Sequence, residues 1–100
     1  MNGMRKSQII DKIIKNDVCE AEGAIYSYSL IANESTAVIS YRLPLYSIAI
    51  EMIDKDGNKT SAKTHDLFSD VGKALVFYRK LVDNLATPLN LPYILEDELQ

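Results

Sequence analysis

The chain contains one histidine, His65, which is followed directly by Asp66. A histidine beside a carboxylate could act as a general base, because the carboxylate can orient the imidazole ring. Such a pair also needs a nucleophile, and Cys19 lies in a distant segment with nothing to fix its distance from His65. We therefore interpret His65 as an exposed strand residue and predict that the protein is not an enzyme.

The segment Asp54-Lys55-Asp56-Gly57-Asn58 resembles the start of a calcium-binding loop. An EF-hand loop, however, places its glycine at the sixth position and a bidentate glutamate at the twelfth. Here the glycine is the fourth residue of the segment and the twelfth is His65. An Asp-Gly pair also tolerates the positive φ of a tight turn, so the segment predicts a β-hairpin.

The remaining candidates for chemistry lack partner residues. Glu96, Asp97 and Glu98 are consecutive and would point in different directions around a helix, which indicates a solvated end. A zinc site needs three or four ligands, and no spacing in the chain gathers them. The four glycines match neither nucleotide-binding pattern. We therefore predict no catalytic residue, no metal site and no cofactor.

Length and composition predict one globular domain over residues 1–100, since 47% of the residues are hydrophobic and 25% are charged. Residues 1–16 carry a net charge of +3, which leaves −6 for the rest. An acidic body argues against nucleic-acid binding. Membrane-surface contact by the basic residues 5–15 is a weak alternative. No segment is long enough for a membrane span, and a lone cysteine fits the cytoplasm.

Alternating hydrophobic and polar residues predict four strands, at 24–31, 36–42, 46–53 and 59–65. We expect a turn at Asn33-Glu34-Ser35 between the first two, and Pro44 should interrupt the ladder before the third. The connections are short, so sequential strands should pair in an antiparallel way. The last strand carries Lys59 and Lys63, which are typical of an exposed edge.

Helical periodicity begins at Val71, with Ser69 as the expected N-cap. The predicted core-facing residues are Val71, Leu75, Tyr78, Leu81, Val82 and Leu85. A second short helix should follow, with Asn90 as its cap and Leu91, Leu95 and Leu99 aligned.

Residues 1–20 form either a helical or a strand-forming N-terminal arm. Isoleucine pairs with helical spacing slightly favour a helix, while a strand over 12–19 that turns at Glu22-Gly23 is the alternative.

Strands followed by helices indicate an α+β fold, an antiparallel β-meander of about four strands. The C-terminal helix should pack on one face of this sheet, and a short terminal helix should follow it.

The order of these motifs resembles a family of small uncharacterised bacterial proteins described only as a domain of unknown function. The resemblance covers about Tyr26 to Leu99 and rests on three segments: Tyr26-Ser27-Tyr28-Ser29-Leu30, then Tyr46-x-Ile48-x-Ile50 followed by Asp66-Leu67-x-Ser69-Asp70, and Thr87-Pro88-Leu89-x-Leu91 running into Ile94-Leu95-Glu96-Asp97-x-Leu99. It implies the architecture predicted above and brings no known activity, cofactor or partner.

The two faces of the predicted sheet differ in chemistry. One face carries tyrosines and isoleucines, and we expect it to form the core. A small-ligand pocket between sheet and helix is the alternative, lined by Tyr28, Tyr41, Tyr46 and Tyr78. The other face presents Ser27, Ser29, Ser40, Ser47 and Ala49. This face could be covered by the N-terminal segment, by a protein partner or second copy, or by solvent.

We therefore predict a protein-interaction or regulatory domain that acts with an unknown protein partner or by self-association, as a homodimer. A small-ligand binding module is the second hypothesis.

Overall fold

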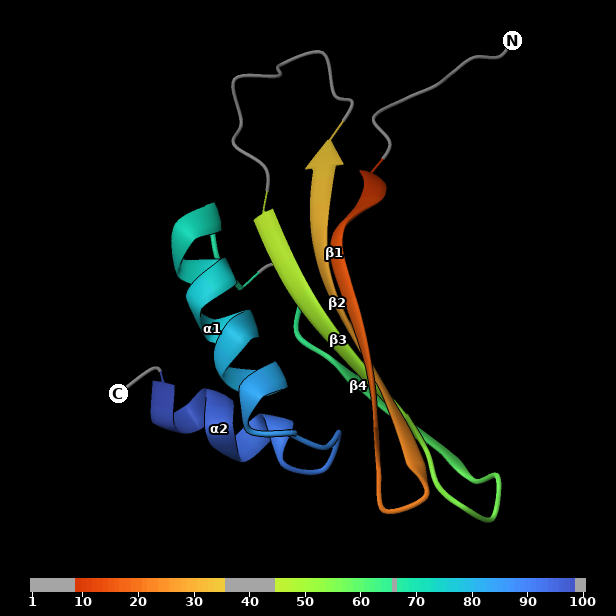
Figure 1. Cartoon of the computed structure of the whole chain (residues 1–100). Helices are drawn as coiled ribbons and strands as arrows, with labels where there is room; N and C mark the ends of the chain where they lie inside the picture. The colour runs from red at the N-terminus through yellow and green to blue at the C-terminus, as the bar shows by residue number, and fades with distance from the viewer. Residues whose placement is uncertain (1–8, 36–44, 66, 99–100) are drawn as a thin grey trace, which may run out of the picture.

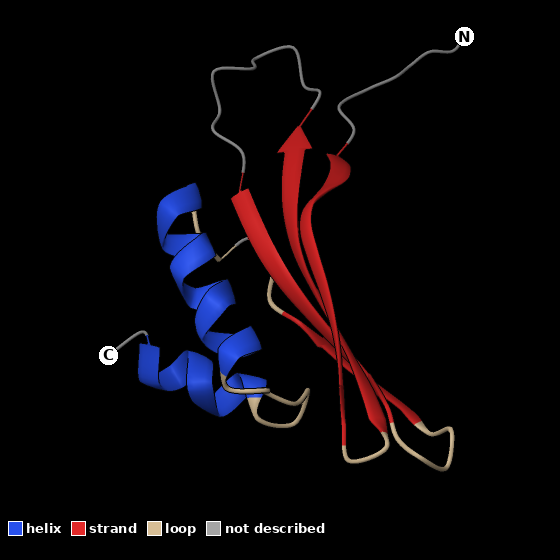
Figure 2. Ribbon diagram, in the orientation of Figure 1, coloured by secondary structure: helices blue, strands red, loops and turns tan. Residues whose placement is uncertain are grey.

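The computed structural model describes residues 9–35, 45–65 and 67–98. They form four strands, β1 (Ile9–Ala21), β2 (Ala24–Ser35), β3 (Leu45–Ile53) and β4 (Lys59–Lys63), followed by helices α1 (Val71–Asp83) and α2 (Leu91–Glu98). The strands make one antiparallel sheet in the order β1-β2-β3-β4. Both helices lie on the same side of this twisted sheet (Figures 1 and 2). The predicted α+β meander is confirmed.

The N-terminal arm is a strand, so the preference for a helix is wrong and the alternative is correct. β1 pairs with β2 from Ile9 to Ala21, with one bulge between Ile13 and Lys15. Its β-branched isoleucines lose side-chain freedom in a helix and fit a pleated strand. Backbone pairing with the long strand β2 therefore stabilises a strand here, although the isoleucines have helical spacing.

A two-residue turn, Glu22-Gly23, joins β1 to β2 where the strand alternative placed it. Both residues have positive φ values, +52° for Glu22 and +83° for Gly23. This geometry matches the primed hairpin turn, which favours Asn-Gly. The glutamate is thus held in a left-handed conformation that costs L-residues free energy.

We expect Glu22→Asn to stabilise the protein by about 0.5–1 kcal/mol, because asparagine tolerates the left-handed region. Thermal unfolding followed by circular dichroism should show a melting temperature raised by roughly 2–8 °C. Glu22→Ala removes the same charge and keeps the unfavourable φ, so it serves as the control. A gain in the alanine variant equal to that in Glu22→Asn would contradict the explanation.

β2 continues through the segment where a turn was predicted, so that prediction is wrong. Asn33, Glu34 and Ser35 pair with Asp11, Ile10 and Ile9 of the long β1 strand, which supplies hydrogen-bond partners for their backbone. The predicted strand at 36–42, with Ser40 and Tyr41, lies outside the described residues, as does Pro44.

β3 and β4 form the hairpin predicted from the Asp-Gly pair. One carboxylate oxygen of Asp54 accepts the backbone N–H groups of Asp56 and Asn58, at 2.9 and 2.8 Å. These bonds, with that of Asn58 contributing most, hold the pKa of the exposed Asp54 carboxyl below its usual value. β4 ends at Lys63, two residues before the predicted end. There the buried Thr64 hydroxyl accepts the backbone N–H of Ile48 at 2.9 Å.

Helix α1 begins one residue later than its predicted cap implies. The N-cap is Asp70, whose carboxylate accepts the backbone N–H of Gly72 at 2.8 Å, and not Ser69. Aspartate at this position also complements the positive end of the helix dipole. The helix ends at Asp83 because Leu85 adopts a φ of +52°, the left-handed conformation common after a helix C-terminus.

Helix α2 confirms the predicted second helix, and its first residue, Leu91, is buried. The side chain of Asn90 turns back, and its oxygen accepts the Thr87 hydroxyl at 2.9 Å. It is the backbone carbonyl of Asn90 that accepts the N–H of Ile94. Leu95 is half-buried against the core, and Leu99 lies outside the described residues.

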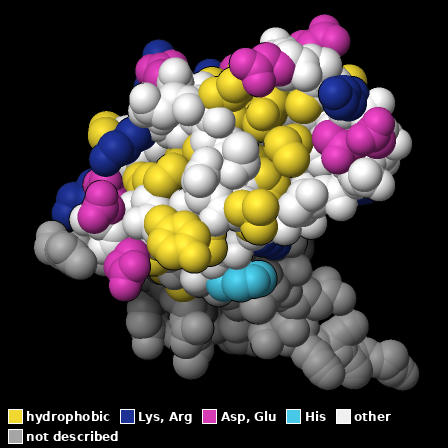
Figure 3. Space-filling model, turned by 90° about the horizontal axis from the view of Figure 1, so that it is seen from below, with side chains coloured by type: hydrophobic (Ala, Val, Ile, Leu, Met, Phe, Trp, Pro, Cys, Tyr) yellow, Lys and Arg dark blue, Asp and Glu magenta, His cyan; other side chains and the backbone are white. Residues whose placement is uncertain are grey.

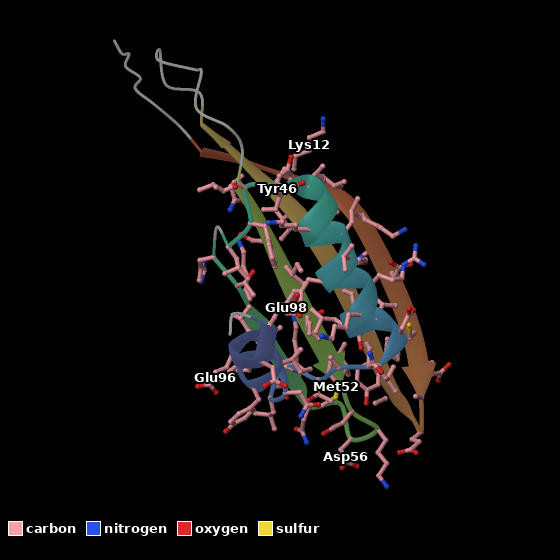
Figure 4. All side chains as sticks on the ribbon, turned by 90° about the vertical axis from the view of Figure 1, so that its left-hand side faces the viewer. Lys12, Tyr46, Met52, Asp56, Glu96 and Glu98 are labelled. Atoms are coloured by element: carbon pink, nitrogen blue, oxygen red, sulfur yellow. The ribbon has the colours of Figure 1, made fainter. Side chains whose placement is uncertain are left out.

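The core lies between the helices and one face of the sheet, across β2 and β3 (Figure 4). The strands contribute Tyr28, Leu30, Ile48 and Ile50, while the helices contribute Ala74, Phe77, Tyr78, Leu81 and Leu91. The predicted core-facing stripe of α1 is partly wrong, since Val71 and Leu75 are exposed.

Candidate protein-interaction face

The sheet has a second face, opposite the helices, which neither α1 nor α2 covers (Figure 1). Cross-strand partners share a face, and Tyr28 and Ile50 point toward the helices. The alternate residues therefore point away, in rows that run across all four strands. We call these rows the open face: Glu20-Ile25-Ile53-Lys59, Val18-Ser27-Glu51-Ser61 and Asn16-Ser29-Ala49-Lys63.

The relief of the open face is uneven. Val18 stands on the edge strand β1 with 63% of its surface exposed, and Ile25 beside it is 45% exposed. A shallow hollow of about 460 Å³ lies over β2, β3 and β4, around the short side chains of Ser29, Ala49 and Ser61. Its lining includes Ser27, Ser29, Ala49, Ser61, Lys63 and His65. The face thus combines an apolar ridge with a depression lined by both polar and apolar side chains.

Asn16 fixes the polar groups on the ridge side of the face. Its amide nitrogen donates to the backbone oxygen of Tyr28 at 2.9 Å and to the hydroxyl oxygen of Ser29 at 3.0 Å. It also approaches the hydroxyl oxygen of Ser27 at 3.4 Å. These contacts join β1 to β2 by side chains as well as by the ladder, so the serines have a defined arrangement.

Charges on the open face are separated between its two edges. Glu20 lies on β1, while Lys59 and Lys63 lie on β4. Between them, Glu51 of β3 forms an ion pair with Lys59, with 3.1 Å between the carboxylate oxygen and Nζ. In these three rows the β1 edge therefore carries one negative charge and the β4 edge two positive charges.

The predicted small-residue surface is partly brought together. Ser27, Ser29 and Ala49 all lie on the open face and line the hollow. Ser47 has the same orientation in β3 but is fully buried, and its hydroxyl oxygen accepts the Asn33 amide at 2.9 Å. Ser40 lies outside the described residues. Asn16, Val18 and Glu20 also lie on the open face but were not predicted, because a helix was slightly favoured for residues 1–20 and their segment has no clear alternation of apolar and polar residues.

The tyrosines predicted to line a ligand pocket occupy different environments. Tyr28 and Tyr78 are fully buried in the core. The Tyr28 hydroxyl donates to the backbone oxygen of Ala86 at 2.7 Å, and that of Tyr78 donates to Asp17 at 2.7 Å. Tyr46 is half-buried and pairs with Phe68 through its backbone, whereas Tyr41 lies outside the described residues.

The hollow that Tyr78 borders lies between α1 and β1. It measures about 400 Å³ and is lined also by Lys15, Leu75, Val76 and Arg79. The structure therefore does not gather the predicted tyrosines around one cavity within its described part.

The candidate catalytic residues are also kept apart. Cys19 is half-buried on β1, and His65 is exposed after β4, so they belong to opposite edges of the sheet. Asp66 lies outside the described residues. Within the described ranges, no group of three His, Cys, Asp or Glu side chains is arranged to hold a metal ion.

The acidic residues Glu96, Asp97 and Glu98 are exposed, and Glu98 pairs with Lys80 at 3.1 Å. Figure 3, a view from the end with both hairpin turns, shows a band of hydrophobic side chains with charged groups around its margin. Among the residues that the structure describes, no helix has the length and hydrophobicity to cross a membrane.

Comparison with known proteins identifies a family. The model of a family of unknown function, DUF6514, covers residues 10–100. The match is wider than the resemblance noted from the sequence motifs, because it includes β1. No curated protein and no solved structure matches the chain significantly.

Proposed function

We propose that this chain, which belongs to the DUF6514 family of unknown function, is a non-enzymatic protein-interaction domain that binds its partner through the open face. The observation that carries the proposal is the exposure of this sheet face, opposite the helices. The exposed side chains of Val18 and Ile25 stand there beside a shallow hollow. Exposed hydrophobic side chains rimmed by polar ones are typical of protein-binding surfaces.

The non-enzymatic part of the proposal is supported by the placement of the reactive side chains. Cys19 lies on β1, and His65 follows β4 at the opposite edge of the sheet, so the strand order does not bring these two side chains together. We also propose a bacterial cytoplasmic protein, since the single cysteine is free and a reducing compartment keeps it so.

The sharpest test introduces a large cation at the centre of the open face. Ala49 is half-buried between Ser29 and Lys63, so Ala49→Arg fills the hollow with a charged side chain. Tagged wild-type and variant proteins would be incubated with lysate of the source organism, and the captured proteins compared by quantitative mass spectrometry. We expect Ala49→Arg to lose at least about tenfold of its specific partner, since steric blockage removes the contact.

The matched control is Lys73→Glu on the exposed side of α1, away from the open face. It should retain the partner. Circular dichroism and thermal unfolding must show that both variants remain folded. Equal capture by Ala49→Arg and wild type would contradict the use of the open face.

A further inference from the structure

We propose that the open face binds a second copy of the same chain, face to face, with the two-fold axis parallel to the strands. The inference rests on the proposed function and specifies its partner. A two-fold axis in this direction places β1 of one copy over β4 of the other, and β2 over β3. Each row of the open face then lies over the same row of the second copy, with the order of its residues reversed.

Charge complementarity favours this arrangement. The row Glu20-Ile25-Ile53-Lys59 places Glu20 over Lys59 of the second copy, and Lys59 over Glu20, by symmetry. Between these ion pairs, Ile25 meets Ile53 twice. The acidic and basic edges of the face are therefore complementary to themselves under this one rotation.

The other two rows are compatible with the same rotation. In the row Asn16-Ser29-Ala49-Lys63, the Asn16 amide oxygen can accept from the Lys63 ammonium of the second copy. In the row Val18-Ser27-Glu51-Ser61, the Ser27 hydroxyl can donate to Glu51. No charge in these three rows faces a like charge.

A two-fold axis perpendicular to the strands would have the opposite effect. It would place each strand over its own copy, and β4 over β4 brings Lys59 next to Lys63 of the second copy. Because these two lysines lie at the same edge, their repulsion disfavours that arrangement. The charge pattern therefore selects the axis as well as the face.

The relief of the face agrees with the same axis. Val18 projects from β1, and in the proposed dimer it lies over Ser61 at the margin of the second copy's hollow. The ridge of each copy thus meets the depression of the other. Two facing sheets pack about 10 Å apart with strand directions within about 30°, and the short serine and alanine side chains permit such an approach.

The expected dimer is weak. Four strands about 4.8 Å apart, followed over the five residues of β4 from Lys59 to Lys63, give a projected area of roughly 300 Å² per copy. The total of roughly 600 Å² is below the limit of about 1,000 Å² for a stable specific interface and falls in the range of weak, transient contacts. We therefore expect reversible association in the range of tens to hundreds of micromolar.

The test is sedimentation equilibrium of the full chain from 10 to 500 µM (roughly the range in which a weak interface associates). Glu20→Lys should weaken dimerisation about tenfold, because two symmetry-related pairs change from attraction to repulsion. Lys59→Glu should weaken it similarly, although it also removes the pair with Glu51. The double variant Glu20→Lys/Lys59→Glu should regain affinity lost in both single variants.

The Lys73→Glu protein has the same net charge as Lys59→Glu and should dimerise like wild type. Recovery in the double variant supports the arrangement, and it cannot arise from misfolding of the singles. A dimer that is insensitive to these charge reversals and to Ala49→Arg would use another surface and overturn the inference. A monomer at all concentrations would also overturn it. The proposed function would then survive only if lysate partners still depend on Ala49.

Discussion

Replacing Phe77 with alanine is expected to lower the free energy of unfolding by about 3–5 kcal/mol, the largest stability effect of any single change considered. Phe77 is fully buried at the centre of the sheet–helix interface. Its ring lies 5.6 Å from that of Phe68, measured between centroids, at an interplanar angle of 47°. Aromatic pairs in this tilted geometry add stabilisation beyond the burial of their area.

Urea denaturation followed by circular dichroism would measure the effect of Phe77→Ala. Domains of this size have total stabilities of roughly 5–15 kcal/mol, so part of the variant population should be unfolded at 37 °C. The matched control is the neighbouring Val76→Ala, since Val76 is 69% exposed. Its expected change is within about 0.5 kcal/mol. Similar midpoints for the two variants would show that the core does not depend on Phe77.

Elements that depend only on neighbouring residues could be predicted from the sequence. The strand at 46–53 and the hairpin after it follow from alternation and from an Asp-Gly pair, both of which act over a few residues. The serine positions of the open face follow from the same alternation, since the pleat sends successive residues to opposite faces.

The strand β1 was not predicted as the favoured structure because the residues with which it pairs are distant in the sequence at its N-terminal end. Ile9 pairs with Ser35, and a bulge after Ile13 disturbs the alternation at the point where strand periodicity would have been visible. The charged and apolar residues that β1 adds to the open face were therefore missing from the predicted surface. Register between strands, which aligns Glu20 with Lys59 through β2 and β3, has no local sequence signal.

The face of α1 that forms the core was also set by tertiary geometry. Leu75 and Ala74 are adjacent, and hydrophobicity alone favoured Leu75 as the buried residue. The structure instead buries Ala74, a small side chain that permits the helix to approach the sheet closely, together with Phe77 and Tyr78. A choice of this kind depends on the shape of the opposing strands.

Removing the Tyr78 hydroxyl with Tyr78→Phe is expected to cost about 1–3 kcal/mol. This hydroxyl donates to the Asp17 carboxylate at 2.7 Å and approaches the Tyr28 backbone oxygen at 3.1 Å. It thereby attaches β1, an edge of the open face, to the helix layer. The control Tyr93→Phe alters a side chain that is 72% exposed and should leave the urea midpoint unchanged. Equal midpoints for Tyr78→Phe and wild type would show that this attachment adds nothing to stability.

The same buried hydroxyls predict how stability depends on alkaline pH. Burial raises the pKa of Tyr28 to about 12, and burial together with the bond to Asp17 raises the pKa of Tyr78 further above its ordinary value of 10.0. A raised folded-state pKa stabilises the protein fully below pH 10, and this stabilisation is lost as the pH rises through the folded-state pKa. Urea midpoints should therefore fall between pH 10 and pH 12.

Each of the two tyrosines should contribute up to about 1.4 kcal/mol per pH unit to this fall. The double variant Tyr28→Phe/Tyr78→Phe starts from lower stability at pH 8, because the Ala86 carbonyl and the Asp17 carboxylate lose their donors. Its stability should then decline less steeply above pH 10 than that of wild type, since the two buried hydroxyls with raised pKa values are absent. Parallel declines in the two proteins would mean that neither hydroxyl is held protonated by the fold.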